Sequence, residues 1–469
     1  MDAILGVVEG FYNDVLSIAM MLLLVAVGIF LTVRGRFFQF RKFGTAMKNT
    51  IGTVFSKSSH VKSESGVSAF QAVTTALAAT IGTGSIAGVA TALVSGGPGA
   101  IFWMWVSALL GMMTKYSEIV LSLKFREKND EGAYVGGPMY YIKNGLGKNF
   151  KWLAVAFSIF AMVACIGTGN LTQANSISGV VESNLSVAPW ITGLVLSILV
   201  GVVILGGVKR IASVNEKLVP AMGIVFVLVS MICIALNITK VPSAFGLIFR
   251  EAFNFKAAFG GVAGYGVMQA LRYGFGRGVF TNEAGLGSAP IAHAASSTKE
   301  PVKQGMWGIF EVFLTTIVFC SMSALIVLTS NVYLKHFNEG VFPDELKGAV
   351  LSAAAFNEAL PIVGNIGVSL STVFFSLSTL FGWSYYGEVC VGYLFKKNRK
   401  VGVYVYRAVY VICVFIGAVA KIDIVWLVAD CFNALMALPN LVALIALSGV
   451  IIKVTKAYFT AKNEPQIKE

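Results

Sequence analysis

Long apolar segments separated by short polar ones recur along the whole chain. Most of these segments reach the roughly 20 residues that a helix needs to cross the hydrocarbon core of a bilayer. Several are longer than a straight span requires, so we expect tilted or interrupted helices. The pattern predicts eleven membrane-spanning helices, at residues 13–33, 66–95, 98–124, 150–181, 188–208, 212–237, 258–294, 305–330, 362–394, 402–420 and 424–453.

The composition and the distribution of charge agree with a membrane protein. Of the 469 residues, 56% are hydrophobic and only 13% are charged, whereas a soluble domain is about 25% charged. When the segment after the first span is placed inside, 27 of the 36 lysines and arginines fall in inside loops and six in outside loops. This bias predicts a plasma or inner membrane protein with its N-terminus outside and its C-terminus in the cytoplasm. Most of the basic excess behind the net charge of +13 thus lies in the inside loops and reflects membrane topology. A nucleic-acid partner is not expected.

Eleven spans divide into one peripheral helix and two sets of five with opposite starting sides. Such inverted repeats carry corresponding interruptions in the first helix of each set. The predicted units are an extra N-terminal span with an amphipathic cytoplasmic helix (1–62), a first repeat (63–240), a second repeat (241–455) and a cytoplasmic tail (456–469).

The first predicted helix of each set contains a cluster of glycines and polar residues. The clusters are TALAATIGTGSIAGVATALVSGG (75–97) and LRYGFGRGVFTNEAGLGSAP (271–290). Unpaired backbone groups at membrane depth are tolerated only where they line a cavity or are buried in protein. A break offers carbonyls to a cation and amide groups to an anion. Close packing of small residues is the alternative for either cluster alone, but their symmetric positions favour a binding site.

Polar side chains in two other spans extend this candidate site. Asn170 and Gln173 are three residues apart and are expected to share a helix face toward the substrate, with interhelical hydrogen bonding as the alternative. The predicted substrate contacts are Ala79, Gly82, Thr83, Gly84, Asn170, Gln173, Gly274, Phe275, Gly276 and Trp383. Plain packing is the alternative for the aromatic residues among them.

Two adjacent hydroxyls in the ninth span, Ser378 and Thr379, suggest a cation site. Together with backbone carbonyls from the first break they would form an oxygen cage suited to Na⁺ as a coupling ion. Bonding of each hydroxyl to its own helix is the alternative. The predicted metal ligands are Ala78, Ile81, Phe375, Ser378 and Thr379.

Charged residues inside the spans are few. Arg272, Arg277 and Glu283 flank the second cluster and are expected to form gate salt bridges, and Lys115 is expected to pair with Glu118. No carboxylate is expected at either break, so a substrate ammonium would rely on carbonyls. The three histidines are scattered, without a metal-binding or catalytic arrangement, so the chain is not expected to be an enzyme.

Three motifs resemble one transporter family. GGPGAIFWMWVSALLG (96–111) resembles the signature of the alanine or glycine:cation symporters, also called sodium:alanine symporters, and GTGSIAGVATA (82–92) and TNEAGLGSAPIAHA (281–294) look like that family too. The resemblance covers nearly the whole chain. It implies a LeuT-type (APC superfamily) fold with an extra N-terminal helix, and Na⁺-coupled uptake of small neutral amino acids such as alanine and glycine. Ser85 stands where this family would have Asn, so we expect a single sodium site.

Two other functions stay open at this point. A proton-coupled symporter of the same fold would transport in sodium-free buffer under a pH gradient. A membrane channel would conduct without saturation or counterflow exchange. The expected partners are a small neutral amino acid and the lipid bilayer, and nothing in the sequence indicates an obligate protein partner.

Overall fold

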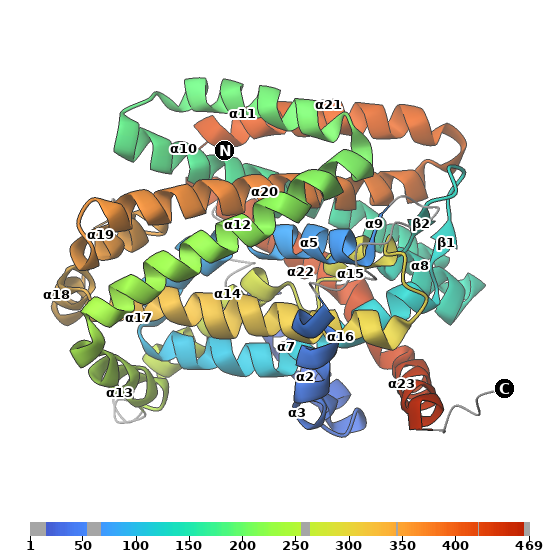
Figure 1. Cartoon of the computed structure of the whole chain (residues 1–469), viewed down its shortest axis with the longest axis horizontal. Helices are drawn as coiled ribbons and strands as arrows, with labels where there is room; N and C mark the ends of the chain where they lie inside the picture. Colours follow the sequence, from blue (N-terminus) through green and yellow to red (C-terminus); the bar gives the residue numbers. More distant parts are fainter. Residues whose placement is uncertain (1–15, 54–66, 255–262, 344–345, 421, 464–469) are drawn as a thin grey trace.

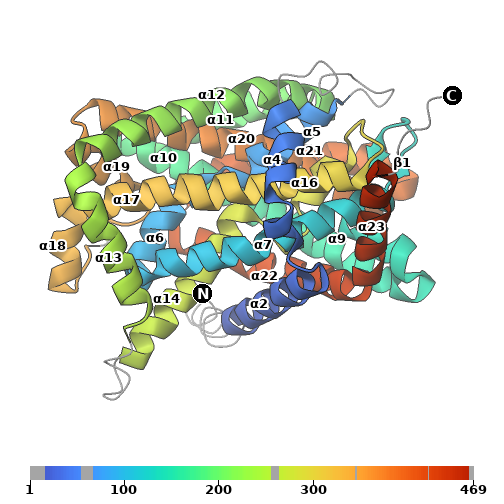
Figure 2. The same ribbon diagram turned by 60° about the horizontal axis from the view of Figure 1, so that its bottom comes forward.

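The structure is a bundle of long helices that mostly run alongside one another (Figures 1 and 2). It is a computed structural model that describes residues 16–53, 67–254, 263–343, 346–420 and 422–463. The starts of the first, second and seventh predicted spans and the predicted boundary between residues 62 and 63 lie outside the described residues.

Helices account for nearly all regular structure. The α-helices are α2 (Ser17–Arg34), α3 (Phe38–Arg41), α4 (Phe43–Asn49), α5 (Ala69–Thr80), α6 (Ala87–Gly96), α7 (Gly99–Lys124), α8 (Pro138–Tyr141), α9 (Lys151–Ile166), α10 (Thr172–Leu185), α11 (Pro189–Ile204), α12 (Gly207–Leu236), α13 (Val241–Ala252), α14 (Ala263–Asn282), α15 (Ala289–Ala294), α16 (Pro301–Val312), α17 (Ser321–Thr329), α18 (Asn331–Glu339), α19 (Ala349–Ala359), α20 (Val363–Leu394), α21 (Arg399–Val419), α22 (Ile422–Ala446) and α23 (Ser448–Asn463).

Short segments of other helix types and one hairpin complete the fold. The 3₁₀ segments are η2 (Ile51–Thr53), η4 (Thr83–Ser85), η6 (Lys148–Phe150), η8 (Ile238–Lys240) and η11 (Lys396–Asn398), and the π-helical segments are η5 (Ile142–Leu146), η7 (Gly167–Leu171) and η10 (Phe313–Cys320). Strands β1 (Glu127–Lys128) and β2 (Tyr134–Val135) pair antiparallel. The expected all-helical architecture is therefore correct except for this hairpin.

The apolar stretches agree with a protein embedded in a membrane. Among the described residues, seven helical stretches are long and apolar enough to span a bilayer: Ser17–Arg34, Lys148–Leu185, Gly207–Leu236, Pro301–Thr329, Val363–Leu394, Lys396–Val419 and Ala429–Ala446. Helices α6 and α11 are apolar but shorter. The predicted span at 424–453 does not continue to its expected end, because the helix is interrupted between Ala446 and Ser448.

The second half of helix α20 lies in the interior of the bundle, and in Figure 1 the helix passes between α21 and α5. Every residue from Ser378 to Val391 is buried, and a helix that is buried on all sides belongs to the interior of a large protein. Helices α5, α9, α10, α12 and α21 pack around it. This position lets α20 present side chains to several elements at once.

Candidate functional site

The first predicted cluster interrupts a helix, as expected. Helix α5 begins at a capping box in which Ser68 and Gln71 bond each other's backbone amides, and it ends at Thr80. The chain leaves helical geometry at Ile81 and Gly82, passes through η4, and resumes in α6. All residues of this break are buried in protein, as the burial rule for irregular backbone at membrane depth requires.

The break leaves the Ala78 carbonyl without a helical partner, and two hydroxyls of α20 donate to it. The oxygen of Ala78 has no helical partner because Gly82 lies outside α5. Thr379 Oγ1 lies 2.9 Å from this oxygen and Ser378 Oγ lies 3.2 Å from it. Each hydroxyl is also 2.9 Å from the carbonyl of Phe375. The structure thus brings four of the five predicted cation ligands together, and the fifth, Ile81, directly follows the last residue of α5.

Gln173 reaches the same break from the start of α10. Its Oε1 accepts a hydrogen bond from the Thr83 amide at 3.4 Å. A Cβ atom on Gly82 would lie 2.7 Å from Thr379 Oγ1 and 3.4 Å from Gln173 Oε1, so only glycine allows this close approach. Thr83 Oγ1 is buried without a hydrogen-bond partner among the described residues. The hydroxyl of Thr83 is therefore available to a small ligand.

The side chains of Asn170 and Gln173 form hydrogen bonds with different partners. Asn170 Nδ2 donates to the carbonyl of Tyr410 in α21 at 2.7 Å, whereas Gln173 Nε2 bonds the Thr168 carbonyl at 3.0 Å. The π-helical segment η7 widens the turn between α9 and α10, and a π-bulge changes the direction in which following side chains point. The prediction that Asn170 and Gln173 share one helix face assumed a regular α-helix, whereas residues Gly167–Leu171 are π-helical.

The second interruption lies later in the chain than Gly274 to Gly276. Helix α14 is continuous through those residues to Asn282. The chain then passes through Glu283, Gly285 and Gly287, which have φ angles of 56°, 96° and 79°. Helix α15 begins afterwards, with Pro290 in its first turn, where proline is tolerated. Within the predicted stretch, the later pair of glycines forms the break.

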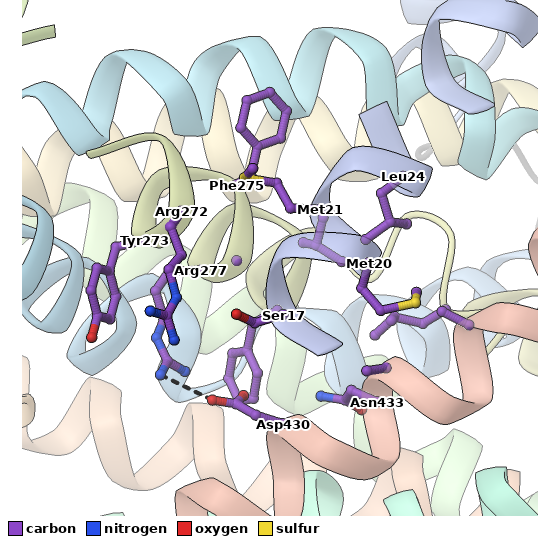
Figure 3. A pocket seen from close by; sticks show the side chains of 16 residues that line it. Ser17, Met20, Met21, Leu24, Arg272, Tyr273, Phe275, Arg277, Asp430 and Asn433 are labelled. Carbon is purple, nitrogen blue, oxygen red and sulfur yellow. Dashed lines mark hydrogen bonds and ion pairs between the residues drawn. The ribbon is translucent and has the colours of Figure 1, made fainter. Parts of the chain in front are cut away.

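The earlier glycines of that stretch have other neighbours. A Cβ on Gly274 would lie 2.5 Å from the Ala100 carbonyl, so this glycine allows α14 to pack closely on α7. Phe275 and Gly276 line a cavity of about 160 Å³ between α2, α14 and α22 (Figure 3). The predicted substrate contacts in α14 are thus not at either break. The residues of α14 that meet the first break are Phe280 and Thr281, beside Gly84.

Arg277 was expected to form a gate salt bridge, and in the cavity of Figure 3 it pairs with Asp430, a partner that was not predicted. Arg277 Nη2 lies 3.1 Å from Asp430 Oδ2 in α22, and both side chains are mostly buried. Glu283, also expected in this group, instead bonds elsewhere. Trp383 Nε1 donates to Glu283 Oε1 at 3.0 Å, and Ser288 Oγ donates to Glu283 Oε2 at 2.5 Å.

Protein side chains fill the second break. Glu118 Oε1 accepts the amides of Gly285 and Gly287, each at 3.1 Å. Asn440 Nδ2 also donates to this oxygen, at 2.5 Å, and to the Gly285 carbonyl at 2.9 Å. The expectation that no carboxylate lies at a break is therefore wrong, because Glu118 approaches from another helix and Glu283 begins the break itself. The second break supports the fold, and its amides are already bonded.

One lysine connects the ends of both interrupted helices. Lys115 Nζ lies 3.1 Å from Thr80 Oγ1, 2.9 Å from the Asn282 carbonyl and 3.1 Å from Glu311 Oε2. His293 Nε2 is 2.8 Å from the other oxygen of Glu311. The ion pair of Lys115 is therefore with Glu311 and not with Glu118 as expected. A cation is favourable at the C-terminal ends of helices, where the dipole is negative.

Comparison with known proteins identifies the family. The pattern of the sodium:alanine symporter family matches residues 1–469. The chain belongs to the sodium:alanine symporter family. It is 47% identical to a sodium/alanine symporter of Methanococcus maripaludis, over 94% of each chain, and 35% identical to a probable sodium/glutamine symporter of Bacillus subtilis, over 99% of this chain and 92% of that one.

A solved structure shares the fold of this symporter-family chain. The structure of MhsT in complex with L-phenylalanine matches with a TM-score of 0.57 and 12% identity, over 82% of this chain and 97% of that chain. This likeness concerns the fold alone, and it agrees with the LeuT-type architecture that the motifs implied. The chain is thus a membrane-embedded transporter and not a member of an enzyme class.

Two serines that cover the first break were not found from the sequence of this symporter. Ser323 in α17 donates to the Ser85 carbonyl at 2.7 Å, and Ser352 in α19 donates to the Ile86 carbonyl at 3.1 Å. The Ile86 carbonyl also accepts the Ala90 amide of α6, at 3.2 Å. Both serines are single hydroxyls in apolar helices, a pattern that does not distinguish them from serines bonded to their own helix.

Proposed function

We propose that this protein is a secondary symporter that uses a sodium gradient to import a small neutral amino acid, alanine or glycine, by alternating access. The observation that carries the proposal is the convergence of Ser378 and Thr379 on the Ala78 carbonyl, which the first break frees. Family membership and the names of the relatives support sodium and alanine.

Sodium would be held by neutral oxygens. The carbonyls of Ala78, Ile81 and Phe375 and the hydroxyls of Ser378 and Thr379 are the ligands that we propose. The two hydroxyls now donate to carbonyls, and each would turn an oxygen lone pair toward a bound ion. The four residues already in contact are all buried: Ala78, Phe375, Ser378 and Thr379. The cage therefore excludes bulk water. One such cage supports one sodium ion per substrate.

The substrate would lie beside this ion, against the first break. Its carboxylate would meet the amides of Thr83 and Gly84 at the positive end of the second half-helix, with Gln173 alongside. Gly82 and Gly84 are both within close contact of neighbouring side chains, so the walls leave room for a small side chain only. Ala79 and Trp383 are proposed as outer contacts of the substrate. Ala79 of α5 packs against Gly382 of α20 beside the first break, and Trp383 of α20 donates to Glu283 at the second break.

The arrangement of spans is part of the same proposal. The two interrupted helices, α5–α6 and α14–α15, would be the first members of two inverted repeats of five spans, with α2 as the extra helix of eleven. The N-terminus would lie outside and the C-terminus in the cytoplasm. Labelling of single cysteines introduced at Lys151 and Lys335 with a membrane-impermeant thiol reagent tests the orientation, since only the second is expected to react from outside.

Alanine binding and uptake test the function. Purified protein is expected to bind alanine more tightly in Na⁺ than in K⁺, and equal affinities would remove sodium coupling. Proteoliposomes with sodium and pH gradients imposed separately distinguish the alternatives. Uptake driven by a pH gradient without sodium would indicate proton coupling, and flux without saturation or counterflow would indicate a channel.

A further inference from the structure

A second cavity, whose lining includes no residue of either break, is lined by an excess of positive charge. It lies between the end of α2, α3 and α23, which are neighbours at one edge of the bundle (Figure 2). Its lining includes five cationic side chains: Arg34, Arg36, Arg41, Lys42 and Lys456. No carboxylate is among the described residues that line it. Five like charges around one cavity repel one another unless an anion lies between them.

The bonds that these cations make leave their charge uncompensated. Arg41 Nη1 donates to the Arg36 carbonyl at 3.3 Å, and Lys42 Nζ lies 5.1 Å from the centre of the Phe459 ring. Within the part of the chain that the structure describes, none of the five forms an ion pair with a carboxylate. Arg36 and Arg41 are exposed, so their guanidinium groups can reach a ligand without rearrangement of the helices.

The cavity lies where an apolar helix ends. Helix α2 is an apolar span of 18 residues that finishes at Arg34, and the side chain of Val33 just before it is 57% exposed. Phe37 and Phe40, which follow, are 51% and 48% exposed. Exposed apolar residues beside a run of Lys and Arg are typical of the boundary between the hydrocarbon core and the headgroups. Phosphates of the lipid lie at this depth.

We propose that this cavity binds the phosphate headgroup of an anionic phospholipid. The arginines would bond the phosphate oxygens, as guanidinium groups do in many phosphate sites, and the acyl chains would lie against Val33, Phe37 and Phe40. Basic pockets between helices at a membrane surface are suited to such headgroups. The excess of positive charge favours an anionic lipid over a zwitterionic one.

Two residues that line the cavity contact the same tyrosine, Tyr116 of α7. Phe38, which lines the cavity, has its ring centre 4.7 Å from that of Tyr116 in α7. Thr455, on the opposite wall, is 2.8 Å from Tyr116 Oη. Tyr116 directly follows Lys115, the residue that joins the two interrupted helices. Lipid binding is therefore expected to stabilise the folded protein as well as to occupy its surface.

Phosphatidylglycerol and phosphatidylcholine, added to detergent-purified full-length protein, provide the test. Native mass spectrometry is expected to show retained phosphatidylglycerol, and thermal unfolding is expected to shift upward with this lipid and not with phosphatidylcholine. The double variant Arg36→Gln/Arg41→Gln should bind phosphatidylglycerol about tenfold or more weakly, since each cation near the membrane surface contributes roughly 1 kcal/mol. Lys148→Gln/Lys151→Gln removes the same charge from two exposed lysines elsewhere and should bind like the unmodified protein.

Three results would overturn the proposal. Equal phosphatidylglycerol affinity in Arg36→Gln/Arg41→Gln and in the unmodified protein would place the lipid elsewhere. An equal loss of phosphatidylglycerol affinity in Lys148→Gln/Lys151→Gln would show that the effect depends only on the net charge of the protein. Displacement of phosphatidylglycerol by millimolar glycerol 1-phosphate or inorganic phosphate would identify a soluble anion as the ligand. Sodium-dependent alanine binding by the same preparations verifies folding, and it separates this proposal from that of transport because neither arginine contacts the breaks.

Discussion

The ammonium of Lys115 lies 2.9 Å from the carbonyl oxygen of Asn282, the last residue of α14. The same nitrogen is 3.1 Å from the hydroxyl of Thr80, the last residue of α5. A single buried cation thus connects the points at which both helices stop. Because Glu311 balances its charge at 3.1 Å, the two interrupted helices are joined by a neutral group of side chains.

Replacing Lys115 by Met should destabilise the protein strongly. The variant leaves the Glu311 carboxylate buried without its cation, and loss of one partner of a buried ion pair costs about 3–5 kcal/mol. Thermal unfolding in detergent measures the effect. The double variant Lys115→Met/Glu311→Gln should recover part of the loss, because no uncompensated carboxylate remains. A double variant as unstable as the sum of both single changes would show that the two residues act independently.

Replacing Thr379 by Val should weaken the apparent affinity for sodium without changing the size of the side chain. The hydroxyl that meets the Ala78 carbonyl at 2.9 Å is lost. We expect the sodium concentration for half-maximal alanine uptake to rise by about tenfold, equivalent to about 1.4 kcal/mol. Thr372→Val in the same helix is the control, since Thr372 Oγ1 bonds only the Val368 carbonyl of its own helix among the described residues. The same rise in both variants would move the ion elsewhere.

Replacing Gly82 by Ala should impair alanine binding. The added methyl group would lie 2.7 Å from Thr379 Oγ1, so the hydroxyl or the break must shift, and overpacking of this kind costs about 1–3 kcal/mol. Binding of alanine in sodium, measured by calorimetry, is expected to weaken at least tenfold. Gly88→Ala is the matched change at the start of α6, because its added methyl group would have no neighbour nearer than 4.0 Å. Unchanged alanine binding by Gly82→Ala would show that the first break is not part of the substrate site.

Replacing Glu118 by Gln should loosen the second break. One carboxylate oxygen accepts the amides of Gly285 and Gly287 and the side chain of Asn440, and hydrogen bonds to a charged group contribute about 1.5–3 kcal/mol. A lower unfolding temperature is expected. Glu127→Gln, which removes a partly exposed pair with Lys143, should change stability by less than about 1 kcal/mol. An unchanged Glu118→Gln protein would mean that the break holds its shape without this carboxylate.

The apolar pattern predicted most helices closely. The predicted spans 98–124 and 362–394 correspond to α7 and α20 within one residue at either end. The length of an apolar segment can be read from the sequence alone. The break after Thr80 could be found as well, since Gly82 and Gly84 are small residues in a run that is otherwise apolar. The family resemblance was also evident from local motifs, and the comparisons confirm it.

The second break illustrates what a local pattern leaves open. The stretch from 271 to 290 contains five glycines, and the first three lie in a continuous helix where one of them, Gly274, meets the Ala100 carbonyl of α7. The last two adopt positive φ angles. Close packing and chain interruption both favour glycine, so composition alone could not tell one use from the other.

The sequence by itself determined that this is a helical membrane transporter, with one interrupted helix near Gly82 and a pair of hydroxyls in the ninth span. Only the tertiary structure decided which partners meet. Glu118 and Lys115 belong to one helix, yet they bond different partners. Glu118 accepts the amide of Gly285 in the second break, whereas Lys115 donates to the carbonyl of Asn282 at the end of α14 and pairs with the distant Glu311. Membrane spans can be predicted from the sequence because the free energy of transfer into lipid is a property of each segment by itself. Polar contacts between helices depend on rotation and relative depth, which arise when all the segments pack together.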